Sequence, residues 1–126
     1  MNAEELAQRI SQLALEKKGQ NIVILDLREL TDITDFFVIV SGESDIHVKT
    51  LVNHIERQLK EEGVRVWHIE GYQRLNWVLM DYVDVVVHIF RPEIRAFYGL
   101  ELLWADAKMT RVEDHADHRI VSEGTD

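Results

Sequence analysis

The feature of this sequence that most limits its possible folds is an apolar run from residue 83 to residue 90, VDVVVHIF. Asp84 and His88 are its only polar members, and four of the other residues are valine. β-Branched residues at this density are typical of a strand that is buried on both faces. We therefore expect this run to be the central strand of a sheet on which the rest of the chain packs.

Two longer segments, residues 3–18 and 44–62, carry apolar residues at the spacing of amphipathic helices. Ser44 is a suitable N-cap for the second helix, and Gly63 has the residue type that ends one. Pro92 follows the apolar run and is placed to occupy the first turn of a further, short helix. The sequence thus predicts two long helices and at least one short one.

Short strands are expected at four other places: 22–27, 36–40, 64–69 and the alternating segment from Leu75 to Met80. Trp67 lies in the third of these, where we expect it to pack in the core. His68 and His88 are expected to be histidines that the sheet accommodates, without a functional role.

These elements predict an α/β or α+β fold with a mixed five-stranded sheet covered by the two long helices. The helix of residues 44–62 joins two strands by a crossover, so those strands should be parallel, whereas the last three strands should be antiparallel. A chain of 126 residues has the length of one domain, which we expect to span residues 1–107. Beyond it, charge rises and periodicity ends, which predicts a flexible polar tail over residues 108–126.

Composition excludes several classes of protein. The chain contains no cysteine, which excludes a fold held by disulfides. Its first residues lack the basic and apolar regions of a signal peptide. No run approaches the ~18 apolar residues that span a membrane, so we expect a cytoplasmic protein. The net charge of −9 argues against binding dominated by nucleic-acid phosphates and favours a basic protein as partner. The alternative is that the acidity only maintains solubility.

Three acids raise the question of an enzyme. Glu70, Asp81 and Asp84 stand near predicted strand ends, and the turn Ser41-Gly42-Glu43-Ser44 precedes a helix N-terminus that could hold an anion. Nucleotidyltransferases use a Gly-Ser turn together with an Asp-x-Asp pair, but His68 stands where the first acid would be. We therefore predict a nucleotidyltransferase-like scaffold without catalysis, with no cofactor and no metal. An atypical nucleotidyltransferase is the alternative.

Three blocks of sequence together resemble the Iojap-related ribosomal silencing factors, the RsfS family. They are LTDITDFFVIVSGESDIHV at residues 30–48, the EG…W…MDYVDVVVHIF block at residues 70–90 and RAFYGLELLWADA at residues 95–107. The resemblance implies a protein without enzymatic activity that binds ribosomal protein fourteen of the large subunit. Bound there, such a factor sterically prevents joining of the small subunit and represses translation when nutrients are scarce. Organellar relatives act instead in large-subunit assembly, which remains an alternative. Val83 departs from the family pattern, which has a glycine there.

Eight residues are candidates for the binding surface. Trp77 is a large rigid anchor of the kind that is enriched at interface hot spots, and acids around it would meet a basic partner. The complete candidate set is Glu70, Tyr72, Arg74, Trp77, Leu79, Met80, Asp81 and Asp84. Each has a structural alternative, above all that Trp77 belongs to the core.

The terminal segment FYGLELLW, residues 97–104, is expected to pack internally, with a homodimer contact as the alternative. Little direct contact with nucleic acid is expected.

Overall fold

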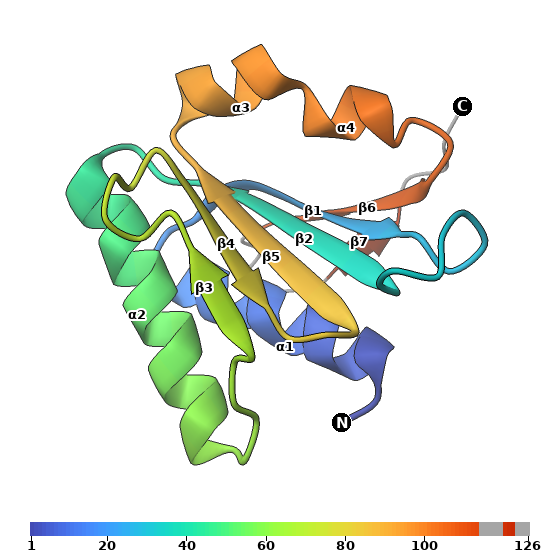
Figure 1. The fold of residues 1–126 in the computed structure, drawn as a ribbon, viewed down its shortest axis with the longest axis horizontal. Coiled ribbons are helices and arrows are strands. Elements are labelled where there is room, and N and C mark those ends of the chain that lie inside the picture. Colours follow the sequence, from blue (N-terminus) through green and yellow to red (C-terminus); the bar gives the residue numbers. More distant parts are fainter. Residues whose placement is uncertain (114–119, 123–126) are drawn as a thin grey trace.

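A computed structural model describes residues 1–113 and 120–122 of the chain, which form a single sheet with helices on both faces (Figure 1). The elements follow one another as α1 (Ala3–Glu16), β1 (Gln20–Asp26), β2 (Phe36–Ser41), α2 (Asp45–Glu61), β3 (His68–Glu70), β4 (Trp77–Asp81), β5 (Val85–Phe90), α3 (Pro92–Tyr98), α4 (Leu100–Leu103), β6 (Lys108–Val112) and β7 (Ile120–Ser122). The fold class is α+β.

The sheet is mixed and its strands lie in the order β3-β4-β5-β2-β1-β6-β7. β2 and β5 pair in parallel, and every other neighbouring pair is antiparallel. Strands β2 and β3, which α2 connects, therefore run in the same direction, and the antiparallel arrangement of β3, β4 and β5 is confirmed. The expected count of five strands is wrong, because β6 and β7 extend the sheet to seven.

Strand β5 is formed by the valine-rich run and is buried along its whole length. All six of its residues are buried, since β4 and β2 pair with its two edges and side chains from helices cover both faces. The prediction of a strand buried on both faces is confirmed. It is an interior strand but not the central one, which in this sheet is β2.

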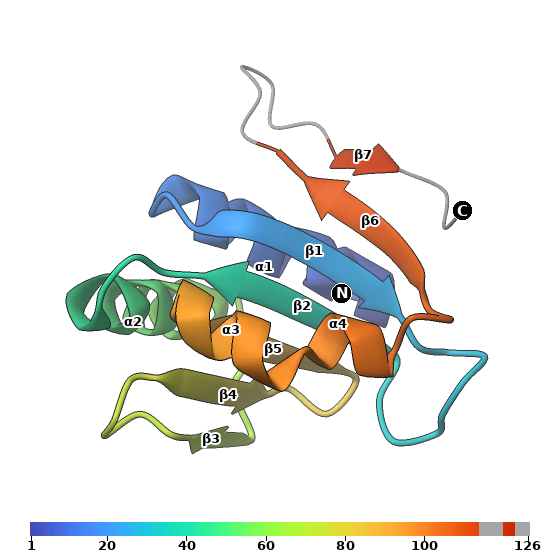
Figure 2. The ribbon, with the colours of Figure 1, turned by 90° about the horizontal axis from the view of Figure 1, so that it is seen from above.

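The helices divide the core into two layers. α1 and α2 lie along one face of the sheet, and the short helices α3 and α4 cross the other (Figures 1 and 2). Val38, Val87 and Ile89 are fully buried in the first layer, while Ile39 and Phe90 belong to the second. Alternate residues of the interior strands thus serve opposite layers, as the period of two in a strand requires.

The ends of the helices follow the signals in the sequence. The Ser44 side chain accepts a hydrogen bond from the His47 N–H, and α2 ends just before Gly63. Asn2 and Glu5 form a reciprocal capping box at the start of α1. Pro92 occupies the first turn of α3, as predicted.

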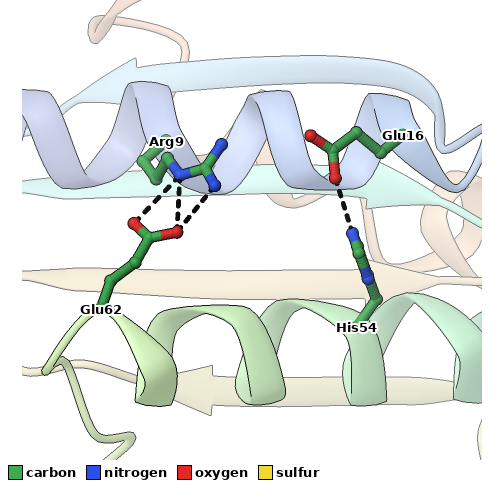
Figure 3. Close-up of polar contacts among 4 residues, drawn as sticks. All are labelled: Arg9, Glu16, His54 and Glu62. Atoms are coloured by element: carbon green, nitrogen blue, oxygen red, sulfur yellow. Dashed lines mark hydrogen bonds and ion pairs between the residues drawn. The ribbon is translucent and has the colours of Figure 1, made fainter.

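Two polar contacts join α1 to α2 across the first layer (Figure 3). The Arg9 guanidinium donates to both carboxylate oxygens of Glu62, with a closest distance of 2.7 Å. Farther along the helices, Nε2 of His54 lies 2.8 Å from a carboxylate oxygen of Glu16. These contacts link the two helices, which lie side by side over the apolar side chains beneath them.

Two expectations from the sequence are wrong. Of the predicted strand 64–69, only His68 and Ile69 belong to β3, and Trp67 is 71% exposed rather than part of the core. The predicted tail is also shorter than expected, because Lys108–Val112 forms β6 against β1. Ile120–Ser122 of the same predicted tail forms β7 against β6, and residues 114–119 and 123–126 lie outside the described residues. Within the described part of the chain, no helix is both long and apolar enough to cross a membrane.

Candidate functional site

On the sheet face that carries α3 and α4, the region of β3 and β4 is not covered by a helix. The two helices cross above β5 and β2, and no helix lies over β3 and β4 on this side (Figure 2). Trp77 of β4 lies opposite Phe90 of β5 and contacts Tyr98 of α3, so alternate residues of β4 point toward this side. Register places the partners of β3 on the same side. We call the set His68, Glu70, Trp77, Leu79 and Asp81 the Trp77 face.

Trp77 is half-buried and held on several sides by aromatic rings. Its ring centroid lies 4.7 Å from that of Phe90 and 4.9 Å from that of Tyr98. Its indole N–H donates a hydrogen bond of 3.1 Å to Nδ1 of His88. The side chain is therefore both packed and accessible, and the two sequence interpretations, anchor and core residue, each describe part of its environment.

His88 of β5 pairs with Leu79, is a diagonal neighbour of Trp77, and is 3% exposed. Burial lowers the pKa of this imidazole to about 4, because a charged ring would lose its hydration there. His88 is therefore neutral at physiological pH. The sequence indicates a histidine that the sheet accommodates but not its contact with Trp77, which depends on the pairing of β4 with β5.

A shallow depression of about 260 Å³ lies beside the indole and is lined by Glu70, Gly71, Trp77 and Leu79. Gly71 adopts a left-handed conformation with φ of 81°. A Cβ atom on this residue would lie 2.1 Å from the carbonyl oxygen of Trp77. Only glycine allows the chain to approach the start of β4 so closely, and this residue therefore helps to shape the site.

The three predicted acids differ in their surroundings. The Glu70 side chain is 64% exposed and lies 3.2 Å from His68. An oxygen of Asp81 accepts a hydrogen bond of 2.7 Å from the backbone N–H of Val83, so this carboxylate also supports the turn between β4 and β5. Asp84 is exposed in that turn, which excludes the alternative that it is buried. The acids thus follow β3 and β4 from the centre of the Trp77 face to one end.

The remaining candidates from the sequence are only partly brought together. Met80 is fully buried in the layer beneath α1 and α2, so its expected place in the binding surface is wrong. Alternation with Leu79 places it on the opposite side of β4. Tyr72 is half-buried, and its hydroxyl donates to Asn53 of α2. Arg74 is exposed in the loop that precedes β4.

The turn at residues 41–44 is engaged in structural contacts. The hydroxyl of Ser41 accepts a hydrogen bond from Arg95, a buried residue of α3 that also pairs with Glu101 at 2.9 Å. Ser44 caps α2. Among the residues that the structure describes, no group of three or more acidic, histidine or cysteine side chains could hold a metal ion.

The segment 97–104 packs only in part. Leu100 is buried and Trp104 contacts Phe37, but three other apolar side chains point outward. Phe97, Leu102 and Leu103 are 75–82% exposed, and we call them the α3–α4 patch. The expectation that this segment packs internally is therefore wrong for these three residues.

The fold and this surface define a class of protein, a small α+β protein that presents a packed but accessible tryptophan with acids beside it. The sequence matches the family described as "Ribosomal silencing factor during starvation" over residues 1–125. The chain therefore belongs to the RsfS family of ribosomal silencing factors. The prediction from the three sequence blocks is confirmed, and the family agrees with a translation regulator rather than an enzyme.

Individual relatives are similar over most of the chain. A ribosomal silencing factor RsfS of Halalkalibacterium halodurans is 36% identical over 113 residues, which cover 90% of this chain and 97% of that protein. A crystal structure of a Chromobacterium violaceum protein superimposes with a TM-score of 0.80 at 36% identity, covering 82% of this chain and 87% of that one. A mouse protein named "Mitochondrial assembly of ribosomal large subunit protein 1" is 30% identical over 95 residues, 73% of this chain and 42% of its own length.

Proposed function

We propose that this protein binds the large ribosomal subunit through ribosomal protein fourteen, with the Trp77 face as the contact surface. Bound there in the cytoplasm, it prevents the small subunit from joining and represses translation under nutrient limitation. The observation that carries the proposal is the half-buried Trp77 at the start of β4, fixed by neighbouring rings at one end of a part of the sheet that no helix covers. The binding residues all belong to the predicted domain of residues 1–107.

The composition of the Trp77 face supports a protein partner. Aromatic anchors in partly desolvated positions supply much of the binding energy of protein interfaces, and Leu79 beside the indole adds apolar area. Glu70 and Asp81, together with the net charge of −9, favour a basic partner and disfavour a phosphate backbone. Contact with ribosomal RNA is therefore expected to be minor.

Cosedimentation with separated ribosomal subunits tests this proposal. The informative variants are Trp77→Ala, which removes the anchor, and Glu70→Lys, which reverses an exposed charge. Matched controls are Ile33→Ala, an apolar residue that is 85% exposed in the β1–β2 loop, and Glu61→Lys on α2. Glu61→Lys changes the net charge by the same amount as Glu70→Lys but lies on the opposite side of the sheet.

We expect the wild type to sediment with the large subunit only. Trp77→Ala should weaken binding by about 2 kcal/mol or more, as truncation of a hot-spot residue does. Glu70→Lys should weaken it more than Glu61→Lys, and Ile33→Ala should have no effect. Equal losses in the variants and their controls would assign the binding surface elsewhere on the protein.

A role in assembly of the large subunit is the second candidate, and the name of the mouse relative favours it. The same surface would be used on an earlier particle. A strain that lacks the protein separates the two roles. Accumulation of precursor large subunits during growth would indicate assembly, whereas normal subunits with failed shutdown of translation on starvation would indicate silencing.

We also propose that the free protein forms a homodimer through the α3–α4 patch. Three outward apolar side chains on one short segment, Phe97, Leu102 and Leu103, favour burial against another surface. Sedimentation equilibrium should show a dimer for the wild type and a monomer for Leu102→Glu. A wild type that is monomeric at high micromolar concentration would exclude this contact.

The nucleotidyltransferase-like scaffold without catalysis remains our proposal for the origin of the fold. Its support is that Ser41 hydrogen-bonds Arg95, Ser44 caps α2 and Asp81 holds a turn, so these groups serve the structure. Calorimetry with a nucleoside triphosphate and Mg²⁺ at millimolar concentration tests it. Measurable binding that requires both Ser41 and Mg²⁺ would favour the atypical enzyme instead.

A further inference from the structure

His88 has two ring nitrogens in different situations. Nδ1 accepts the hydrogen bond from the Trp77 indole N–H, 3.1 Å away. Nε2 is buried and has no hydrogen-bond partner among the described residues. The ring of Phe37 packs against the imidazole at 72° with a centroid distance of 4.5 Å, and the Phe90 ring lies parallel to it at 6.1 Å. The imidazole is thus packed between neighbouring rings in one orientation beside the indole.

This geometry determines which tautomer is present. An indole nitrogen can only donate a hydrogen bond, so Nδ1 of His88 must be the acceptor and carries no proton. Because the ring is neutral, its single N–H proton is on Nε2. A buried N–H without a partner costs free energy. In the described structure Nε2–H carries this cost, while the other ring nitrogen, Nδ1, is hydrogen-bonded to Trp77.

The pair has a consequence for any surface that meets Trp77. The indole N–H is the only polar group of this side chain, and at protein interfaces it commonly bonds to the partner. Here it points inward and is already paired, while Phe90 and Tyr98 restrict rotation of the ring. A partner therefore meets only the carbon edge of a side chain whose orientation is set before binding, which reduces the entropy cost of association.

We propose that His88 is a positioning residue that holds the Trp77 N–H inward, so that the Trp77 side chain fits an apolar socket in its partner with no hydrogen-bond acceptor for the indole. This inference rests on the proposed function, because the partner surface is taken to be on the large ribosomal subunit. It adds the chemistry of the socket and a residue that does not itself contact the partner.

Two pairs of variants test the inference by affinity for the large subunit. His88→Asn retains an acceptor, because its amide oxygen is bonded to Cγ as Nδ1 is, whereas His88→Leu removes it. We expect His88→Leu to weaken binding about tenfold and His88→Asn by no more than about threefold. Trp77→Phe, which keeps a ring but has no N–H, should bind within about fivefold of the wild type, and Trp77→Ala should lose about 30-fold or more.

Hydrogen exchange of the Trp77 indole, followed by ¹⁵N NMR, provides a readout that does not require the ribosome. The Trp77 signal is assigned by its absence in Trp77→Phe, and the exposed Trp67 supplies the rate for a free indole. We expect slow exchange in the wild type and in His88→Asn, and exchange close to that of Trp67 in His88→Leu. A thermal melt of each variant establishes that it is folded.

The outcomes separate this inference from the proposed function. If the wild type fails to bind the large subunit, the proposed function fails, while the exchange rates still decide whether His88 positions Trp77. The inference is overturned if Trp77 exchanges equally slowly in His88→Leu. It is also overturned if Trp77→Phe binds as weakly as Trp77→Ala, because the partner would then be using the indole N–H. Should His88→Leu not fold, the comparison of Trp77→Phe with Trp77→Ala decides the question.

Discussion

Gly71 offers a test of how closely the loop before β4 is built against the Trp77 face. Its φ is 81°, and a Cβ atom would lie 2.1 Å from the carbonyl oxygen of Trp77. Gly63 has nearly the same conformation, with φ of 85°, but a Cβ atom there would meet nothing within 4 Å. Alanine at these two positions therefore separates the cost of the left-handed backbone from the cost of the contact with Trp77.

The expected magnitudes follow from these geometries. A left-handed alanine costs roughly 1–2 kcal/mol, which the smaller conformational freedom of the unfolded alanine variant partly offsets, so Gly63→Ala should lose about 1 kcal/mol. Gly71→Ala carries the same cost and must also move the Trp77 carbonyl by roughly 1 Å, a displacement comparable with overpacking at about 1–3 kcal/mol. We therefore expect Gly71→Ala to lower the free energy of unfolding by about 3 kcal/mol.

Urea and thermal unfolding of the two variants measure this difference. The melting temperature should fall by roughly 10 °C or more for Gly71→Ala and by about 4 °C for Gly63→Ala. Gly71→Ala should also weaken binding to the large subunit, since the start of β4 is displaced, whereas Gly63→Ala should not. Equal destabilisation by the two substitutions would refute the reasoning, because the contact with Trp77 would then contribute nothing.

Three further predictions concern other parts of the fold. The pKa of His88 falls from 6.5 to about 4 on folding, so as the pH is lowered the unfolded state takes up this proton before the folded state does. The contribution of neutral His88 to the free energy of unfolding should be complete above pH 6.5 and decrease by on the order of 3 kcal/mol as the pH falls to 4. Urea titrations should show this pH dependence in the wild type and a flatter one in His88→Asn. Val83 is a β-branched residue at φ of 75°, which strains its backbone. Val83→Asn should therefore raise the free energy of unfolding by about 1 kcal/mol. An unchanged or lower melting temperature would contradict this. A double-mutant cycle on Arg9 and Glu62 should give a coupling below about 1 kcal/mol that decreases in high salt, because the pair is partly exposed; a salt-independent coupling would indicate a more buried pair.

The parts of the fold that could be predicted are those where local and tertiary preferences agree. The run that forms β5 has side chains suited to burial on both faces, and Ser44 and Gly63 carry the chemistry that bounds α2. Strand β6 was missed because Lys108–Val112 is short and mostly polar; it pairs with β1 along its whole length, and only Met109 and Val112 pack against the core.

The errors around β3 have a similar origin. Val64 and Val66 do pack against the first core layer, which accounts for the alternation in the sequence. The segment joins β4 only at its end, where the Trp67 N–H donates to the carbonyl of Asp81 and His68 is the first residue paired in register. Trp67 is consequently exposed instead of lying within a covered strand. An apolar pattern shows which residues are attracted to a core, whereas the length of a strand depends on a partner that is distant in the sequence.

The sequence was sufficient to predict the exposed residues of the candidate site but not the contacts that Trp77 makes with its neighbours. Alternation along β4 identified Trp77 and Leu79 as residues of one face, and the same alternation should have placed Met80 on the other. The contact between Trp77 and His88 depends on the register of β4 against β5, which the sequence does not specify. The same holds for the approach of Gly71 to Trp77.

The most direct test of the central claim is a subunit-joining assay followed by light scattering. Large subunits are incubated with the wild type, Trp77→Ala or Ile33→Ala before small subunits are added. We expect the wild type and Ile33→Ala to suppress joining to the same extent, and Trp77→Ala to allow it at equal concentration. Undiminished suppression by a folded Trp77→Ala variant would contradict the assignment of the Trp77 face, and unimpeded joining with saturating wild type would contradict silencing by steric exclusion.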